Sequence, residues 1–238
     1  MTRSGCGALG AVQWDWVCGY SGFMGASEDA YSAEPFVPEE LSLEALRKAA
    51  AGCRGCPLHR DATQTVFGAG AADARVMLLG EQPGEQEDRL GRPFVGPAGK
   101  LLDRALEEAG LSADAYVTHA VRHFTFTRAE LRRRRTHRAP TLREMAARGP
   151  WPAAGPAVVR PAPVVILGAT AGRALFGSSF RGGEARGALL EREIHGRPEK
   201  LVATVHPSSV LRARDEEERA SAYRGLVADP TVAAEALR

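Results

Sequence analysis

The sequence predicts an α/β fold, a three-layer α/β/α sandwich around a four-stranded, mostly parallel sheet. Short apolar runs alternate along the chain with segments of helical periodicity. This alternation is typical of a parallel sheet that is covered by helices on both faces and joined by right-handed crossovers. The first apolar run leads into a loop rich in glycine and proline, and open α/β folds bind ligands at loops beyond the carboxyl ends of their strands. The sequence contains no internal repeat and no sign of a second domain.

Four strands and four helices follow from the apolar pattern. The strands are expected at Val76–Leu79, Tyr116–Val121, Val164–Leu167 and Leu201–Val205. The helices are expected at Leu41–Ala51, Gly99–Ala109, Ala169–Phe176 and Asp215–Val227. The second helix has the clearest apolar stripe and is followed by Gly110, a residue type that commonly terminates helices. The last helix begins with an acidic turn that suits the helix dipole.

Three further segments are assigned less directly. Residues 128–143 are rich in arginine and are interpreted as a basic loop. Residues 148–163 are rich in proline, glycine and alanine and lack helical periodicity, although the topology requires a helix there. The acidic residues Glu85, Glu87 and Asp88 are interpreted as part of a solvated loop.

The composition bounds the class of protein. The 238 residues, 44% hydrophobic and 25% charged, can build one α/β domain with a sizeable core. The net charge of +2 does not by itself indicate a nucleic-acid partner, so any basic surface must be local. No apolar run is long enough to span a membrane, and the first 23 residues do not have the pattern of a signal peptide. We expect a monomeric, cytoplasmic protein.

The N-terminal region is expected to lie outside the fold. Residues 1–40 are predicted to form a poorly ordered extension and residues 41–238 a single domain. Met24 is a candidate initiator, because helix-and-loop sequence begins only after it.

The loop at residues 80–99 carries the groups of greatest chemical interest. Glu81 and Gln82 follow the first strand, and Phe94 lies between proline and valine in a constrained loop. Gly96 and Gly99 open the next helix, where backbone N–H groups favour a phosphate. Residues 96–100 also resemble part of a phosphate-binding P-loop, but the first glycine and the magnesium-binding Ser or Thr of that motif are absent, so a nucleoside triphosphatase is set aside.

Four stretches occur in a characteristic order after the pair Cys53-Arg-Gly-Cys56. They are GEQPGEQEDRLGRPFVGPAGKLLDRAL (80–106), YVTHAVRHFTFTR (116–128), RRRTHRAP (133–140) and VATVHPSS (202–209). Together they resemble the iron–sulfur uracil-DNA glycosylases of family 4, and in particular the UdgX-type branch, which becomes covalently attached to uracil-containing DNA. The resemblance covers residues 53–227 approximately and depends on the whole set of motifs.

The resemblance implies roles for several of these residues. Excision of a flipped-out uracil leaves positive charge on the sugar and negative charge on the base. Glu81 would stabilise the sugar cation, and His206 would donate to the departing base. Phe94 would stack on the base, while Gly80, Gln82 and His119 would line its pocket. Ser208 and Ser209 would bind phosphates, and Val210 with Leu211 could wedge into a base stack.

The arginine-rich segment implies a second reaction. In the resembling proteins the histidine that matches His137 attacks the sugar carbon after uracil leaves and forms a stable protein–DNA bond. A neutral imidazole is a suitable nucleophile for an oxocarbenium ion. The expected DNA contacts are the backbone at Gly96 and Gly99 and the side chains of Arg133, Arg134, Arg135 and Arg138. We expect the partner to be single-stranded, uracil-containing DNA.

The cofactor that the resemblance implies is a [4Fe–4S] cluster, with Cys53, Cys56 and His123 as ligands. The family's further cysteine is replaced by Arg148, which places the occupancy of the cluster in question. Zinc bound by Cys53, Cys56, His59 and His123, or a pair of buried thiols without metal, are the alternatives.

His119 is a second departure from the family, which has asparagine there. Asparagine presents a donor and an acceptor side by side, whereas an imidazole does not. We therefore predict weaker selectivity for uracil or slower excision. Two alternative functions follow from the departures: a glycosylase with ordinary hydrolytic turnover, or a non-catalytic protein that only binds uracil-containing DNA.

Overall fold

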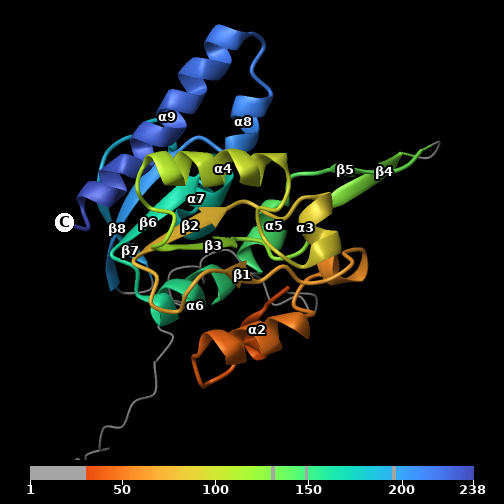
Figure 1. The fold of residues 1–238 in the computed structure, drawn as a ribbon. Helices are drawn as coiled ribbons and strands as arrows, with labels where there is room; N and C mark the ends of the chain where they lie inside the picture. The colour runs from red at the N-terminus through yellow and green to blue at the C-terminus, as the bar shows by residue number, and fades with distance from the viewer. Residues whose placement is uncertain (1–30, 130–131, 148–149, 195–196) are drawn as a thin grey trace, which may run out of the picture.

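Four parallel strands form the centre of the structure, a computed structural model that describes residues 31–129, 132–147, 150–194 and 197–238 (Figure 1). They are β2 (Val76–Gly80), β3 (Ala115–His119), β6 (Pro163–Leu167) and β8 (Arg197–Thr204). β2 and β6 are buried along their whole length because helices cover both faces. Val76 and Leu78 pack into the core on one face, and Met77 and Leu79 into the core on the other.

The sheet has six strands, so the prediction of four was wrong in number. Its order is β1-β3-β2-β6-β8-β7, and the two edge strands, β1 (Gly68–Ala69) and β7 (Leu190–Ile194), are antiparallel to their neighbours. The four predicted strands are the four parallel ones. β1 has only two residues. β7 carries exposed charged side chains, which protect an edge strand from pairing with another chain. Neither strand therefore gives an apolar run in the sequence.

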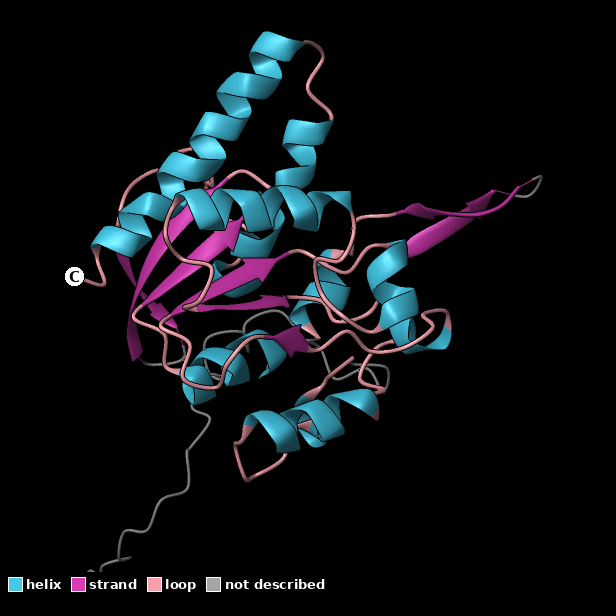
Figure 2. Ribbon diagram, in the orientation of Figure 1, coloured by secondary structure: helices cyan, strands magenta, loops and turns pink. Residues whose placement is uncertain are grey.

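Helices cover the two faces of the sheet as predicted (Figure 2). α4 (Pro97–Glu108) and α9 (Glu216–Glu235) pack on one face, and α6 (Pro150–Val159) and α7 (Ala169–Phe176) on the other. α2 (Leu43–Ala51), capped by the side chain of Ser42, packs outside α6. α9 continues well beyond the predicted end at Val227, through Pro230. None of the helices in these described ranges is long and apolar enough to cross a membrane.

α6 explains the poorly patterned segment. Pro150 and Pro152 stand in its first turn, where a missing backbone N–H costs nothing. Trp151 and Ala154 have no exposed surface, because the helix lies between the sheet and α2. A helix that is buried on several sides has no polar face, and therefore no amphipathic period. Arg148 lies outside the described residues.

Within the expected N-terminal extension, residues 1–30, including Met24, lie outside the described residues. The chain from residue 31 onward contacts the domain: a single 3₁₀ turn, η1 (Glu34–Phe36), follows the fully buried Ala33. The backbone N–H of Ala33 donates to the carbonyl of Ala147. A second 3₁₀ turn, η2 (Pro57–Arg60), follows the cysteine pair.

Two segments interpreted as loops are regular structure. The acidic residues after β2 form α3 (Glu85–Leu90), in which Glu87 and Asp88 are buried, so the assignment as a solvated loop was wrong. The basic segment contains β4 (Phe126–Ala129) and β5 (Arg132–His137), which form an antiparallel hairpin, and then α5 (Leu142–Ala146). The hairpin projects from the body of the molecule (Figure 1).

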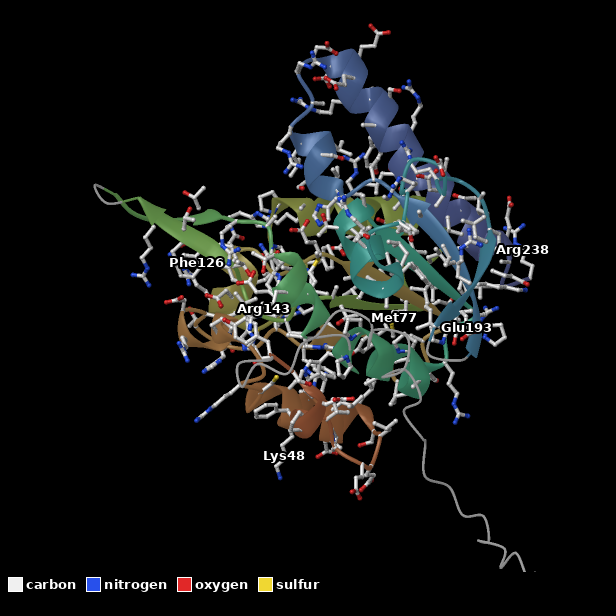
Figure 3. The ribbon with its side chains drawn as sticks, turned by 180° about the vertical axis from the view of Figure 1, so that it is seen from behind. Lys48, Met77, Phe126, Arg143, Glu193 and Arg238 are labelled. Carbon is white, nitrogen blue, oxygen red and sulfur yellow. The ribbon has the colours of Figure 1, made fainter. Side chains whose placement is uncertain are left out.

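The hairpin lies at the end of the molecule where the parallel strands finish. Figure 3 shows Phe126, at its base, on the opposite side from Glu193 of the edge strand β7 and from the C-terminal Arg238. A short helix, α8 (Pro207–Leu211), follows β8 and packs against α4 and α9. The carboxyl ends of β2, β3 and β8 therefore carry the loops that build the candidate site.

Candidate active site

The carboxyl ends of β2, β3 and β8 bring the candidate residues together, with β6 lying between β2 and β8 in the sheet. Gly80, the last residue of β2, pairs with His119, the last residue of β3. The carbonyls of Gly80 and Glu81 accept hydrogen bonds from the backbone N–H groups of residues 120 and 121. This ladder fixes the direction in which Glu81 leaves the sheet, while β8 ends two residues before His206.

Phe94 is held in a constrained position beside His119. Its backbone has φ +53°, a left-handed conformation that is uncommon for a residue with a side chain. Its ring is stacked on the imidazole of His119, with centroids 4.7 Å apart and planes at 14°. A Cβ on Gly80 would press on both rings, and a Cβ on Gly99 would collide with the carbonyl oxygen of Phe94. Gly80 and Gly99 are therefore required by the packing around Phe94.

Glu87 joins the two glycine loops on either side of α3. One carboxylate oxygen accepts from the N–H of Gly84 at 2.9 Å, and the other accepts from the N–H of Gly96 at 3.1 Å. Glu87 is 8% exposed, so these charge-assisted bonds are shielded from solvent. The N–H of Gly96, which the sequence suggested for a phosphate, is engaged by this carboxylate.

His206 is held as a neutral imidazole with a defined tautomer. Its Nδ1 accepts from the backbone N–H of Ser208 at 3.2 Å and lies 2.8 Å from the Ser208 hydroxyl. With Nδ1 as acceptor, the proton stands on Nε2. Burial, followed by the charges of Arg212 and His137, lowers the pKa of His206 to about 4. The hydroxyl of Ser209 donates to the carbonyl of His206.

The His137 side chain is half exposed, and its ring contacts Gln82 and lies near Glu81. The amide nitrogen of Gln82 is 2.9 Å from the carbonyl of Arg138 and 3.3 Å from that of Thr125, so the NH₂ group points toward these acceptors. The same nitrogen lies 2.7 Å from Nε2 of His137. Since the amide nitrogen can only donate, Nε2 of His137 accepts in this contact and carries the lone pair. The two amide hydrogens go to His137 and Arg138, with the longer contact to Thr125 at best shared. Nε2 lies 3.9 Å from a carboxylate oxygen of Glu81, and the His137 side chain is 52% exposed.

Arg135 and Arg138 make ion pairs within the protein. Arg135 donates to the fully buried Asp88 at 2.6 Å and lies 3.4 Å from Glu85. Arg138 pairs with Glu144 at 2.9 Å. These pairs fasten both sides of His137 to the body of the molecule. The side chains of Arg133 and Arg134 lie outside the described residues.

Three polar atoms in this cluster are buried and have no hydrogen-bond partner among the described residues: Glu81 Oε1, Gln82 Oε1 and His119 Nδ1. Burial, followed by the charges of His206 and Arg122, lowers the pKa of His119 to about 3, so its imidazole is neutral. Unpaired buried polar atoms are costly in a finished structure, and a ligand commonly supplies their partners. The cluster therefore has the properties of a binding site for a polar molecule.

The arrangement suits the cleavage of a bond between two oppositely charged fragments. The carboxylate of Glu81 can stabilise positive charge, and the Nε2–H of neutral His206 can donate to a group that gains negative charge. Phe94 supplies an aromatic surface 6.5 Å from the ring of His206. The lone pair of His137 lies on the Glu81 side of the cluster.

Comparison with known proteins shows which family has this sequence and this arrangement of residues. The model of the uracil DNA glycosylase superfamily matches residues 67–227. The chain belongs to this superfamily. A type-4 uracil-DNA glycosylase from Thermotoga maritima is 36% identical over 191 residues, 77% of this chain and 90% of that protein. A second, from Archaeoglobus fulgidus, is 33% identical over 191 residues, 78% and 92% of the two chains. A third, from Pyrobaculum aerophilum, is 32% identical over 177 residues, 72% and 86%.

The cysteine region, by contrast, does not bring its described side chains together as a metal site. Cys53 is buried and accepts a hydrogen bond from the indole N–H of Trp151 at 3.4 Å. Cys56 is also buried, but it belongs to a different group of packed apolar side chains from Cys53. Nε2 of His123 lies 2.9 Å from the hydroxyl of Thr65, and Nδ1 of His59 lies 2.7 Å from a carbonyl. Within the described ranges no three His, Cys, Asp or Glu side chains are grouped to hold a metal ion. Among the described side chains, the predicted ligands of the cluster and of the zinc site are not brought together, and no step below uses a metal.

Sequence reasoning overlooked three residues of this superfamily member's site. Asp88 and Glu87 were assigned to solvent because their partners, Arg135 and Gly96, are remote in the sequence or belong to the backbone. Arg212 was overlooked, although it follows Ser208 by one helical turn and donates to its hydroxyl at 3.0 Å. The only available signal for Arg212 was this four-residue spacing.

Proposed function

We propose that this member of the uracil DNA glycosylase superfamily excises uracil from DNA and then remains covalently attached to the DNA through His137. The observation that carries the proposal is the contact of Gln82 with Nε2 of His137, 3.9 Å from Glu81. A histidine that only contacted phosphate would have no reason to lie beside the Glu81 carboxylate with its Nε2 held by Gln82. The names of the type-4 relatives support uracil in DNA as the substrate.

In the proposed excision, the bond between uracil and C1′ of the sugar breaks and its electron pair leaves with the base. Glu81 stabilises the positive charge that develops on the sugar. The Nε2–H of His206 donates to the base oxygen that becomes negative, and the departing base gains a proton from solvent. His206 suits this role because its depressed pKa keeps it a neutral donor at neutral pH. Phe94 and His119 contact the base.

In the proposed capture, the Nε2 lone pair of His137 leaves Gln82 and forms a bond to C1′. The resulting imidazolium, close to the Glu81 carboxylate, releases its Nδ1 proton to solvent. The net reaction exchanges uracil for histidine at the sugar and consumes no water. Since the Glu81 charge lies beside both the cation and the histidine, one carboxylate serves both steps.

We further propose that the substrate is single-stranded and that the protein acts as a monomer in the cytoplasm. A uracil in a duplex must first be unpaired and unstacked, at a cost of a few kcal/mol, whereas a single strand avoids most of that cost. Of the arginines proposed for DNA contact, Arg135 is only 12% exposed and is committed to its ion pairs, whereas Arg138 is 34% exposed and is the better placed of the two to bind a phosphate.

A denaturing gel tests the proposal. The protein is incubated with a single-stranded oligonucleotide containing one uracil, and a thymine oligonucleotide serves as the control. A retarded band that His137→Ala abolishes, with alkali-labile product taking its place, is the expected result. Alkali-labile product without a retarded band in the wild type would indicate hydrolytic turnover instead.

The non-catalytic reading remains a second candidate because His119 stacks on the aromatic face of Phe94. It predicts neither a retarded band nor alkali-labile DNA, but retention of uracil-containing DNA in a native gel. The iron–sulfur cluster stays a prediction. Iron and sulfide analysis of anaerobically purified protein tests it, with roughly four of each per chain expected for a full cluster.

A further inference from the structure

Three groups make a continuous chain of hydrogen bonds at the start of α8. The guanidinium of Arg212 donates to the hydroxyl of Ser208 at 3.0 Å, and that hydroxyl lies 2.8 Å from Nδ1 of His206. A serine hydroxyl has one proton to donate. Because the Arg212 guanidinium can only donate, it occupies a lone pair of the hydroxyl and leaves the hydroxyl proton for Nδ1.

We propose that Arg212 is a positioning residue that acts through Ser208 to hold His206 in the tautomer with its proton on Nε2. This inference rests on the proposed function, in which Nε2–H is the group that meets the departing base. Without Arg212, the Ser208 hydroxyl could instead accept a proton from Nδ1, and Nε2 would then lack the proton it must donate. The backbone N–H of Ser208, at 3.2 Å, opposes that change but is the longer of the two contacts.

The charge of Arg212 acts in the same direction as its hydrogen bond. A permanent cation near the imidazole disfavours a second positive charge there. The other titratable groups that act on His206 are His137 from β5 and His119 from β3. Both are histidines, so Arg212 is the permanent charge among these three groups. Removing it should raise the pKa of His206 as well as loosen its tautomer.

Arg212 is exposed, so its replacement leaves the core intact, and the chain offers a matched control. Arg214 lies two residues later, its side chain is 90% exposed, and it pairs with Glu218. Arg214→Ala removes one positive charge two residues from Arg212 without changing a partner of Ser208. A difference between Arg212→Ala and Arg214→Ala therefore reports the contact with Ser208 and His206 rather than general attraction to DNA.

Nitrogen NMR of histidine-labelled protein reads the tautomer directly and needs no activity, with His206→Gln used for assignment. The wild type and Arg214→Ala should show an unprotonated Nδ1 and a protonated Nε2. Arg212→Ala should show a mixture of tautomers and a titration midpoint raised by about half a pH unit or more. Arg212→Lys should restore the midpoint, because it keeps the charge. Identical spectra for Arg212→Ala and Arg214→Ala would overturn the proposal.

Single-turnover excision on saturating uracil-containing DNA supplies the kinetic test. Arg212→Ala should lower the single-turnover rate constant for uracil excision about fivefold to twentyfold. This loss is smaller than the hundredfold or more expected when a hydrogen-bond donor to the transition state is deleted outright. In Ser208→Ala the further change Arg212→Ala should have no additional effect, since the two residues act in series. Additive losses, or a loss of DNA affinity alone, would show that Arg212 merely contacts DNA. If the wild type does not excise uracil, the proposed function fails while the NMR result still decides the role of Arg212.

Discussion

Replacing Asp88 by asparagine removes the charge that holds the hairpin to the body of the molecule. Asp88 has no exposed surface, accepts from the backbone N–H of Thr63 at 2.9 Å and pairs with Arg135 at 2.6 Å. The Arg135 side chain is 12% exposed and lies over the rings of Phe124 and Phe126. It cannot reach bulk water without leaving that surface.

The cost of this substitution follows from the burial of the pair. Breaking a buried ion pair by removing one partner costs about 3–5 kcal/mol, because the other charge stays buried and unpaired. Glu85, 3.4 Å from Arg135 and 33% exposed, retains part of the compensation. We therefore expect the lower end of that range, about 3 kcal/mol, out of a total that is typically about 5–15 kcal/mol.

Urea denaturation of Asp88→Asn and Glu85→Gln makes the comparison. Glu85 also pairs with the exposed Arg89, so Glu85→Gln should cost less than about 1 kcal/mol. Because Arg135 precedes His137 by two residues on β5, Asp88→Asn should also reduce covalent capture more than excision. Equal, small losses of stability in the two variants would refute the argument that the buried pair anchors the hairpin.

Three further predictions concern the pocket. Gly99→Ala should destabilise the fold by about 2–3 kcal/mol and slow excision, because the added Cβ collides with the backbone of Phe94; Gly183→Ala, which meets open space, should be neutral in the same urea assay. His119→Asn should raise the rate of uracil excision about fivefold to 150-fold, corresponding to about 1–3 kcal/mol for a bidentate contact. No gain in rate would contradict the prediction that His119 weakens the recognition of uracil. The pKa values of His119 and His206 lie below the ordinary 6.5, at about 3 and about 4, so the unfolded chain binds protons first as the pH falls. The contribution of these histidines to stability should therefore be fully present well above pH 6.5 and should be lost as the pH falls from there through their folded pKa values, by about 2.5 kcal/mol per histidine at pH 4.5. His119→Asn should lessen that loss in urea titrations at pH 7.5 and 4.5.

The sheet could be predicted because each of its central strands is recognisable from its own short stretch of sequence. Val76–Leu79 and Val164–Leu167 are continuous apolar runs, and such runs have few alternatives in a chain that also contains amphipathic helices. The hairpin could not be predicted in the same way. Four of the six residues of β5 are arginine, and it is a strand because Phe126 and Thr127 pair with His137 and Thr136.

The residues of the candidate site likewise fall into those that a sequence motif indicates and those that only tertiary contacts reveal. Glu81, Phe94, His137 and His206 could be proposed as site residues because each stands in a motif whose order along the chain is informative, and the structure brings them near one another. The supporting residues were not found, since their importance arises only in three dimensions. Asp88 is buried because Arg135 folds over it from 47 residues away, and Glu87 because two glycine loops present their N–H groups to it.

Intact-mass spectrometry of the protein after reaction with a uracil-containing oligonucleotide tests the central claim most directly. The account predicts a species whose mass is the protein plus the oligonucleotide minus uracil, and a nuclease-trimmed sugar–phosphate on the peptide that contains His137. Unmodified protein beside oligonucleotide that has lost its uracil, or a modified peptide that lacks His137, would contradict it.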